Sequence, residues 1–246
     1  MTIATYGLVG YPLSHSFSPQ YFERKFIQLN IHACYKLFPI KDISSIVQVL
    51  NEEPGLLGLN VTIPYKEAVI PFLDEVEEAA LEIGAVNCIK ISNKKLVGFN
   101  TDAIGFTNSL KNILQPQHTN ALILGTGGAS KAIAYALKKM QIPYTFVSRR
   151  KKNNEGINYG DLDKHTIDNH RLIINTTPLG MHPYIDTEPL LPYQYITKEH
   201  LLYDLIYNPT TTRFLTHGIT KGASIKNGLE MLELQAEASW NIWHAD

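Results

Sequence analysis

The sequence predicts an α/β protein of two domains. Short apolar segments alternate with amphipathic helical segments along its 246 residues, a pattern typical of sheets covered by helices. Near the middle of the chain, a polar break over residues 115–120 is followed by an apolar segment that runs directly into a glycine-rich turn and a helix. That arrangement is typical of a nucleotide-binding unit. We therefore predict an N-terminal, mainly parallel α/β domain over residues 1–101 and a Rossmann-like domain over residues 102–227.

Composition and charge restrict the kind of ligand that we expect. Hydrophobic residues make up 44% of the chain, which is ample for buried cores. The net charge of -1 gives no basic footprint for nucleic acid, so we expect a small-molecule ligand. No apolar run approaches the roughly 18 residues needed to span a bilayer, and the N-terminus lacks the layout of a signal peptide. We expect a cytoplasmic protein that does not bind membranes.

Neither a disulfide nor a metal site is predicted. Cys34 and Cys88 are isolated in apolar surroundings, which favours buried, reduced thiols. The nine histidines show no metal-ligand spacing.

A hydroxyl-rich loop follows the first predicted strand, which spans residues 6–10. The loop ends at Pro19, which suits the first turn of a helix with Phe22 on its apolar face. In an extended segment Ser16 and Ser18 point the same way, and two hydroxyls on one side can bind a carboxylate or a polyol. The alternative is that Ser18 only caps the helix.

The alternation continues through the next segments. Residues 34–38 alternate like a strand, and Asp42 can cap the helix that follows. Residues 56–63 form another apolar strand, and we expect a helix after Pro64. Thr62 and Lys66 then lie at the carboxyl end of a strand, where ligands bind in open α/β sheets. The alternative for Lys66 is a solvated surface charge.

Acidic residues between 74 and 82 surround apolar ones in the pattern of a solvent-exposed helix face. Residues 85–91 and 95–99 predict a hairpin, with Asn87 in its first strand. Asp102 comes just after the second strand, where we expect it to cap a helix that runs to residue 114. A capped helix start at a domain boundary is also where a cleft can open.

The glycine-rich turn favours a cofactor over an ordinary strand-to-helix turn, although both interpretations fit. Gly125 allows a tight turn, Gly127 allows backbone N–H groups to approach a pyrophosphate, and the helix from Ala129 points its positive end there. Ser130 stands where the third glycine of the usual spacing is expected. The packing of helix on strand must therefore tolerate a small hydroxyl.

The second strand of this unit, residues 144–147, ends in Ser148 and Arg149 with further cations behind them. A unit that binds NAD places an acidic residue here for the ribose 2′-hydroxyl. A bidentate arginine suits a 2′-phosphate instead, which favours NADP. The alternative is a solvated basic turn.

Further apolar strands over residues 171–175 and 201–205 end in polar loops that join the same sheet edge. A last short strand precedes Gly228, which opens a terminal helix with an apolar stripe. Met231 and Gln235 share one face of this helix. A glutamine in a helix is ordinarily a surface residue.

Taken together, these segments resemble the shikimate dehydrogenase family along nearly the whole chain. The matching motifs are Ser16-Phe17-Ser18-Pro19, Asn60-Val61-Thr62-Ile63-Pro64-Tyr65-Lys66, Gly84-Ala85-Val86-Asn87, Asn100-Thr101-Asp102, Gly125-Thr126-Gly127-Gly128-Ala129, Asn175-Thr176-Thr177-Pro178-Leu179-Gly180-Met181, Tyr203-Asp204 to Tyr207, and Gly228 to Gln235.

The resemblance implies two α/β domains around a cleft, with the terminal helix 228–246 returning to the first, substrate-binding domain. It implies reversible, NADPH-dependent reduction of 3-dehydroshikimate to shikimate in chorismate and aromatic amino acid biosynthesis, by a monomer or homodimer. It implies that Lys66 and Asp102 form the catalytic pair. The residues that it places at the substrate are Ser16, Ser18, Thr62, Asn87, Asp102, Tyr207 and Gln235. Those that it places at NADP(H) are Gly125, Gly127, Gly128, Ala129, Ser148, Arg149, Thr177, Gly228 and Met231.

The chain departs from the family pattern after the second nucleotide-binding strand. Ser148-Arg149-Arg150 replaces the usual Asn-Arg-Thr, Asn153 stands where a further arginine is expected, and we expect a helix shortened to residues 154–163. The NADP preference then depends on Arg149, with Lys151 and Lys152 as substitutes.

Two alternatives to this function stay open. The nearest is a quinate or shikimate dehydrogenase that uses NAD. The other is a ligand-sensing or scaffolding protein that keeps the fold without turnover; the presence of Lys66 and Asp102 favours an enzyme.

Overall fold

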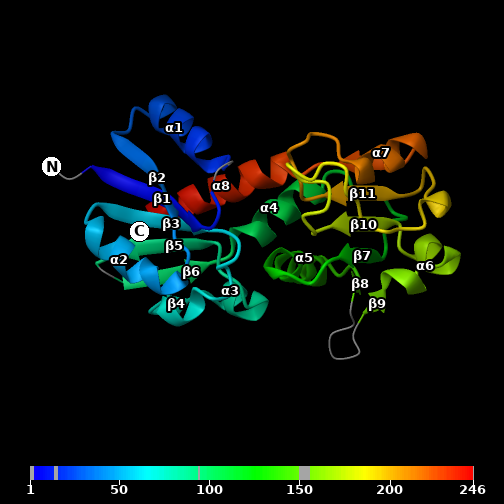
Figure 1. The fold of residues 1–246 in the computed structure, drawn as a ribbon, viewed down its shortest axis with the longest axis horizontal. Helices are drawn as coiled ribbons and strands as arrows, with labels where there is room; N and C mark the ends of the chain where they lie inside the picture. The colour runs from blue at the N-terminus through cyan, green and yellow to red at the C-terminus, as the bar shows by residue number, and fades with distance from the viewer. Residues whose placement is uncertain (1–2, 14–15, 94, 150–155, 246) are drawn as a thin grey trace. The chain divides into compact units, whose positions relative to one another are not determined.

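Helices and strands alternate along the chain, which confirms the predicted α/β class (Figure 1). The computed structural model describes residues 3–13, 16–93, 95–149 and 156–245. The chain divides into two compact units: unit 1 comprises Met1–Thr101 and Gln235–Asp246, and unit 2 comprises Asp102–Leu234. Among the described residues, none of the helices combines the length and the apolar character that crossing a membrane requires.

The sheet of unit 1 is parallel on one side and mixed on the other. β1 pairs in parallel with β2 and with β3. β5 runs antiparallel to β3, and β6 runs antiparallel to β5, as the predicted hairpin requires. In spatial order the strands are β2 (Ala33–Pro39), β1 (Ala4–Gly10), β3 (Leu56–Val61), β5 (Cys88–Ser92), β6 (Lys95–Phe99) and β4 (Glu75–Val76).

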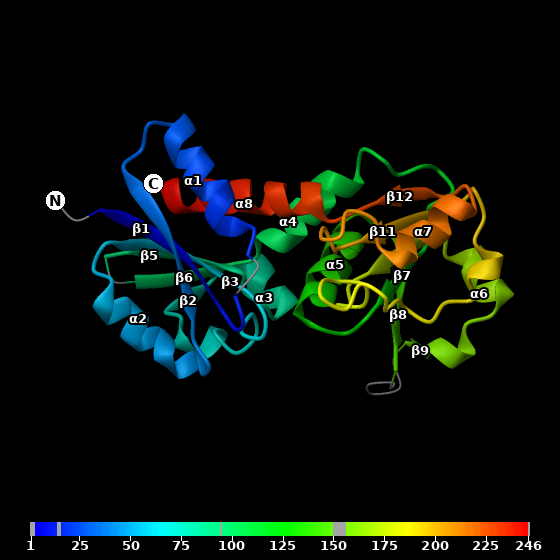
Figure 2. The ribbon, with the colours of Figure 1, turned by 45° about the horizontal axis from the view of Figure 1, so that its top comes forward.

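Helices cover both faces of this sheet, because its strands carry apolar side chains on both. One face packs against α1 (Ser18–Gln28) and the end of α8 (Leu229–His244), in a cluster that includes Phe22 and Trp240. The other face packs against α2 (Ile46–Glu52) and α3 (Glu78–Ile83), in a cluster that includes Val61 and Ala80. Figure 2 shows α1 and α8 together on one side of the sheet and α2 on the other.

The helix predicted after Pro64 does not form. Residues 62–69 make a series of turns, and a short 3-10 helix, η2 (Ile70–Phe72), follows. Pro71 lies inside that segment and has no backbone N–H, so an α-helix that started at Pro64 could not continue through it. Asp42 caps as predicted, but the element that it caps begins as a 3-10 helix, η1 (Ile43–Ser45), before α2.

The sheet of unit 2 is parallel throughout and has the strand order of a Rossmann fold. The direction in which successive strands are added reverses between β7 and β10. In spatial order the strands are β12 (Ser224–Lys226), β11 (Leu201–Asp204), β10 (Leu172–Asn175), β7 (Ala121–Leu124), β8 (Tyr144–Ser148) and β9 (Ile157–Asn158). In such sheets the cofactor binds beyond the carboxyl ends of the strands at the point of reversal.

Helices also cover the sheet of unit 2. On one face, Phe214 of α7 (Arg213–Thr220) and Ile167 of α6 (Lys164–Asn169) pack in a cluster with Leu122 of β7. Towards the opposite face, Phe106 of α4 (Thr101–Leu110) meets Tyr203 of β11 edge to face, with 5.1 Å between ring centroids. The helix after the glycine-rich turn is α5 (Gly128–Lys139).

The prediction of a shortened helix over residues 154–163 is wrong for the described residues 156–163. Gly156 has a φ of +78°, and β9 then pairs in parallel with the end of β8. A 3-10 helix, η3 (Tyr159–Asp161), follows, and α6 begins only at Lys164. Since the backbone of β9 bonds to the sheet, those residues cannot make helical hydrogen bonds.

Candidate active site

The predicted substrate residues of unit 1 arise where strands end at one edge of its sheet. β1 and β3 are parallel neighbours, and β2 lies on the other side of β1. Ser16 lies in the loop after β1 and Ser18 opens α1 directly after that loop, while the turn after β3 carries Thr62 and Lys66. The carboxyl ends of β1 and β3 form the reversal point of this sheet, which is the usual place for a ligand.

Ser18 is not the cap of α1. The N-cap is Phe17, whose side chain makes no capping hydrogen bond, and Ser18 is the first residue of the helix. The Ser18 side chain is buried, and its hydroxyl is a hydrogen-bond partner of the Tyr35 phenol on β2. Ser16 is half-buried just before the helix. The capping alternative for Ser18 is therefore wrong.

The turn that carries Thr62 and Lys66 is fixed by its neighbours. The Thr62 N–H donates to the Val9 carbonyl at 2.9 Å. Tyr65 is buried, and its hydroxyl donates to the Ile40 carbonyl at 2.8 Å. The Lys66 carbonyl accepts from the Val86 N–H at 2.7 Å, and Lys66 itself is half-buried. The backbone of Lys66 is thus held next to the residue that precedes Asn87.

Asn87, Thr101 and Gln235 form a buried cluster, although 148 residues separate the first from the last. The Thr101 N–H donates to Asn87 Oδ1 at 2.6 Å, and Asn87 Nδ2 donates to Thr101 Oγ1 at 3.0 Å. Gln235 Oε1 accepts from Asn87 Nδ2 at 3.4 Å and from Thr101 Oγ1 at 3.3 Å. Gln235 is therefore not a surface residue, because the sheet places this turn of α8 against Asn87.

Asp102 is the second residue of α4 and lies buried in its first turn, rather than at the N-cap. The helix ends at Leu110, earlier than predicted, and turns follow. Lys66 belongs to unit 1 and Asp102 opens unit 2. Their pairing stays a prediction.

The glycine-rich turn of unit 2 lies at the reversal point between β7 and β10. Gly125 has a φ of +110°, and an added Cβ there would lie 2.9 Å from Thr176 Oγ1, so only glycine fits. At Gly127, the N-cap of α5, an added Cβ would meet no described protein atom within 4 Å. Ser130 is buried, and its hydroxyl donates to the Gly127 carbonyl at 2.6 Å. The small hydroxyl is accommodated as predicted.

Thr177 is held by a buried pair of polar residues that the sequence did not single out. Asn175 Oδ1 accepts from the Thr177 N–H at 3.0 Å and from Thr177 Oγ1 at 2.6 Å. Asn175 Nδ2 donates to Asp204 Oδ1 at 3.0 Å. Asp204 also accepts from the Ile206 N–H at 3.1 Å and from Thr212 Oγ1 at 2.6 Å. Two signals were available: Asn175 and Asp204 each end an apolar strand, and both belong to motifs that resemble the family.

Asp204 is a buried carboxyl with a perturbed pKa. Its exposed fraction is 0%. Burial raises the pKa of Asp204 to about 6, and the hydrogen bonds from Thr212, Ile206 and Asn175 oppose that rise.

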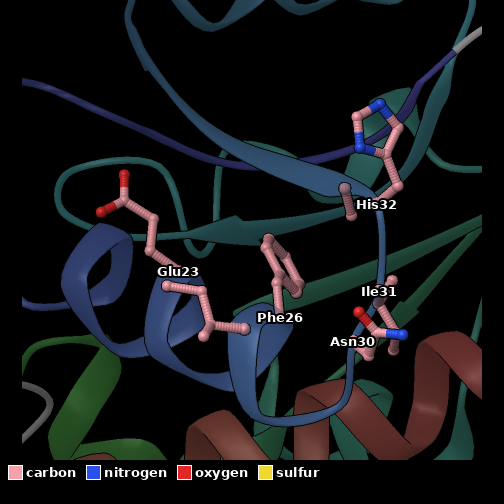
Figure 3. Close-up of a pocket in the computed structure, with 7 residues that line it drawn as sticks. Glu23, Phe26, Asn30, Ile31 and His32 are labelled. Atoms are coloured by element: carbon pink, nitrogen blue, oxygen red, sulfur yellow. The ribbon is translucent and has the colours of Figure 1, made fainter.

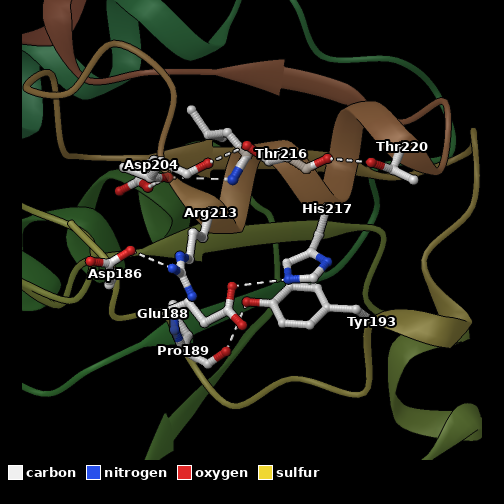
Figure 4. Close-up of polar contacts among 11 residues, drawn as sticks. Asp186, Glu188, Pro189, Tyr193, Asp204, Arg213, Thr216, His217 and Thr220 are labelled. Atoms are coloured by element: carbon white, nitrogen blue, oxygen red, sulfur yellow. Dashed lines mark hydrogen bonds and ion pairs between the residues drawn. The ribbon is translucent and has the colours of Figure 1, made fainter.

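The segment after the Thr177 loop is tied to α7 by polar contacts (Figure 4). Glu188 accepts from His217 Nε2 at 2.9 Å, and the His217 ring stacks on Tyr193 with centroids 3.8 Å apart. Arg213 forms an ion pair with Asp186. These contacts fix the segment that connects β10 to β11.

The remaining predicted cofactor residues also lie in unit 2. Gly228 donates its N–H to the Ile206 carbonyl at 3.0 Å, and an added Cβ would lie 2.0 Å from the Leu205 carbonyl oxygen. Gly228 is thus required by packing against the loop that carries Tyr207. Met231, on α8, is buried, and Tyr207 is half-buried. Gly128 and Ala129 form the first turn of α5.

Ser148 is the last residue of β8 and is half-buried, and Arg149 follows it, exposed. Burial raises the pKa of Tyr159 to about 12, and the positive charge of Arg149 opposes that rise. Arg149 is therefore near the start of η3. Arg150, Lys151, Lys152 and Asn153 lie outside the described residues.

A surface pocket of about 570 Å³ on unit 1 is not part of this site (Figure 3). Its lining includes Phe26 and Ile27 of α1 and Ala33, the first residue of β2. It therefore lies at the end of β2 where the strand begins, whereas the predicted substrate residues follow the ends of parallel strands. Its lining residues include none of the predicted site residues that the structure describes.

Comparison with known proteins identifies relatives along nearly the whole chain. The family model described as the shikimate dehydrogenase substrate binding domain matches residues 8–89. A shikimate dehydrogenase (NADP(+)) of Methanococcus maripaludis is 40% identical over 255 residues, which cover 96% of this chain and 90% of that protein.

Solved structures agree with the sequence comparison. The shikimate dehydrogenase of Aquifex aeolicus superposes with a TM-score of 0.88 at 34% identity, covering 98% of this chain and 92% of that one. That of Thermus thermophilus, in complex with NADP(H) and shikimate, has a TM-score of 0.88 at 29% identity, covering 98% and 94%. With these matches, the chain belongs to the shikimate dehydrogenase family.

Proposed function

We propose that this protein catalyses the reversible, NADPH-dependent reduction of 3-dehydroshikimate to shikimate in chorismate biosynthesis. The observation that carries the proposal is its 40% identity, over 96% of the chain, to a shikimate dehydrogenase (NADP(+)). The structure supports the proposal, because each unit gathers predicted residues at the reversal point of its own sheet. That is the position that α/β sheets use for ligands.

The glycine-rich turn fits the pyrophosphate of NADP(H). The helix α5 has twelve residues, and its N-cap, Gly127, has no side chain to cap the first N–H groups. Protein packing does not require glycine at position 127, since an added Cβ would meet no described atom. A ligand that approaches the backbone closely would require it. The Thr177 loop lies beside this turn, since the Thr176 hydroxyl donates to the Leu124 carbonyl at 2.7 Å.

We assign recognition of the 2′-phosphate of NADP(H) to Arg149 and Ser148 at the end of β8. A guanidinium can donate two parallel hydrogen bonds to a phosphate, and Arg149 is exposed enough to do so. No acidic side chain that would suit a bare ribose hydroxyl occupies positions 148 or 149.

On the substrate side, the chain offers hydroxyl and carboxamide groups. Ser16 and Ser18 would bind the substrate carboxylate, because hydroxyl groups donate hydrogen bonds to anionic oxygens. Asn87 and Gln235 would bind ring hydroxyls, which both donate and accept, as carboxamides also do. The burial of Asn87 and Gln235 supports this role, since a fixed polar group discriminates better than a mobile one.

The chemistry needs a proton at the carbonyl oxygen. When bound, NADPH supplies hydride to the carbonyl carbon, and negative charge then develops on the oxygen. We assign Lys66 Nζ as the donor of the proton to that oxygen, and Asp102 as the carboxylate that keeps Lys66 charged and oriented. In the oxidative direction, Lys66 would accept the proton of the substrate hydroxyl.

Initial rates with shikimate and with quinate, each with NADP⁺ and with NAD⁺, test the proposal. We expect the highest kcat/KM for shikimate with NADP⁺. A higher value for quinate with NAD⁺ would show that the substrate and cofactor assignment is wrong. If shikimate binds but is not turned over with either cofactor, the protein is a ligand-sensing member of the fold.

A further inference from the structure

A network of buried polar side chains lies beneath the predicted substrate residues of unit 1. Tyr35 Oη donates to Asn60 Oδ1 at 2.8 Å, and Asn60 Nδ2 donates to Ser239 Oγ at 2.9 Å. Ser239 Oγ in turn lies 3.2 Å from Thr101 Oγ1. Thr101 and Ser239 are fully buried. Neither the chemistry proposed above nor the predicted substrate contacts use these residues.

The network runs over the face of the sheet that α8 covers. Tyr35 comes from β2 and Asn60 from β3, with β1 between them, and the side chains share a face. Ser239 extends from the part of α8 that belongs to unit 1, which lies on that face in Figure 2. Four separate segments thus contribute polar groups to one otherwise apolar layer. Burying polar groups costs desolvation free energy unless each has a hydrogen-bond partner. A buried polar network of this kind therefore indicates a functional role.

Thr101 determines the orientation of the Asn87 carboxamide. The Thr101 N–H can only donate, and it lies 2.6 Å from Asn87 Oδ1, so the oxygen of Asn87 must face it. Asn87 Nδ2 then faces Thr101 Oγ1 at 3.0 Å. A reversed Asn87 amide would place N–H against N–H in a buried site, which is unfavourable.

The Thr101 hydroxyl also orients Gln235. Gln235 Oε1 accepts from Thr101 Oγ1 and from Asn87 Nδ2, which commits the oxygen of the carboxamide to these two partners. Ser239 is one turn further along α8, and its hydroxyl donates to the Gln235 carbonyl at 3.0 Å. Ser239 Oγ accepts from Asn60 Nδ2, and the single hydroxyl proton of Thr101 has Gln235 Oε1 and Ser239 Oγ as its two acceptors.

We propose that Thr101 and Ser239 are positioning residues that set which end of the Asn87 and Gln235 carboxamides faces the substrate. This inference rests on the proposed function, because it assigns Asn87 and Gln235 to the substrate hydroxyls. We expect Thr101 to contribute more to this positioning than Ser239. The Thr101 N–H contacts Asn87, and the Thr101 hydroxyl contacts both Asn87 and Gln235. Ser239 supports Thr101 from the other side.

The test compares Thr101→Val with Thr101→Ser. Valine keeps the shape of threonine but lacks the hydroxyl, whereas serine keeps the hydroxyl and lacks the methyl group. We expect Thr101→Val to weaken shikimate binding by roughly tenfold, the worth of one buried hydrogen bond, and Thr101→Ser to bind nearly as wild type does. Isothermal titration of shikimate and of NADP⁺ into each protein gives the two dissociation constants, and we expect that for NADP⁺ to be unchanged.

Ser109→Ala is the matched control. Ser109 is a buried serine of α4 whose hydroxyl lies 2.5 Å from Tyr203 Oη, within unit 2. We expect Ser109→Ala to lower the free energy of unfolding by an amount similar to that for Thr101→Val, without changing the affinity for shikimate. Ser239→Ala is a second test that does not alter α4, and we expect it to weaken shikimate binding several-fold.

The proposal is overturned if Thr101→Val and Ser239→Ala bind shikimate as wild type does, or if Thr101→Ser is as weak as Thr101→Val. It is also overturned if the affinities for shikimate and NADP⁺ fall together, because that indicates general loosening of the fold. A wild-type protein that binds shikimate without turnover contradicts the proposed function instead, and the dissociation constants still decide the role of Thr101.

Discussion

Asn175 and Asp204 are the last residues of the neighbouring strands β10 and β11, and Asn175 Nδ2 donates a 3.0 Å hydrogen bond to Asp204 Oδ1. The other end of the Asn175 carboxamide holds Thr177, and Asp204 holds the Ile206 N–H next to Tyr207. One buried pair therefore fixes the loops that carry a predicted cofactor residue and a predicted substrate residue. Burial of the Asp204 carboxyl in this arrangement costs desolvation free energy.

Asp204→Asn should change how stability depends on pH. The pKa of Asp204 is raised to about 6 in the folded protein, against 3.8 as its ordinary value. Between these values the folded state holds a proton that the unfolded state has lost, so stability falls as pH rises from 4 to 6 and is then level. Relative to Asp204→Asn, we expect wild type to lose on the order of 3 kcal/mol of unfolding free energy over this range.

Urea unfolding of both proteins between pH 4 and pH 8 measures this difference. Asp42→Asn serves as the control, because hydrogen bonds from Ser44 lower the pKa of the exposed Asp42 carboxyl, whereas burial raises the pKa of Asp204. Parallel stability curves for wild type and Asp204→Asn would show that Asp204 does not titrate in this range.

Lys66→Ala should lower kcat by on the order of 10² or more, because it removes the proposed proton donor. The fold should survive, since Lys66 is half-buried and its carbonyl contact with Val86 is made by the backbone. Steady-state rates with saturating shikimate and NADP⁺ measure the effect. Lys95→Ala removes an exposed lysine that pairs with Glu75, and we expect it to leave kcat unchanged. A near-normal kcat for Lys66→Ala would end the catalytic assignment.

Arg149→Ala should raise the KM for NADPH by roughly ten- to a hundredfold, because hydrogen bonds to a charged phosphate contribute more than neutral ones. The KM for NADH, which has no 2′-phosphate, should change little. Arg149→Lys keeps the charge but not the paired geometry, and we expect an intermediate value. Equal effects of Arg149→Ala on the two cofactors would refute the role in 2′-phosphate recognition.

The double variant Ser16→Ala with Ser18→Ala should raise the KM for shikimate by tenfold or more, since two donors to its carboxylate are lost. The KM for NADP⁺ should stay as it is. Ser92→Ala, at the exposed end of β5, controls for a general effect of removing a hydroxyl. An unchanged KM for shikimate in the double variant would exclude these serines as the carboxylate site.

Much of the fold and part of the candidate site follow from local sequence. The apolar strands with their glycine-rich turn predict a Rossmann-like unit. In the structure Gly125 has a positive φ, which only glycine adopts freely, and this explains why the turn contains glycine there. Thr62 and Lys66 come after an apolar strand, and that order alone brings them to the carboxyl edge of a parallel sheet. Local periodicity failed after Pro64, where Pro71 prevents the helix.

The sequence by itself determined the class of fold, the order of its elements and the residues that follow each strand, since these depend on neighbours along the chain. Only the tertiary structure decided that Gln235 is buried against Asn87 and Thr101, and that Asn175 meets Asp204. Both contacts depend on which strands and helices pack side by side. Periodicity indicates which face of an element is apolar, but it does not specify the partner that covers that face.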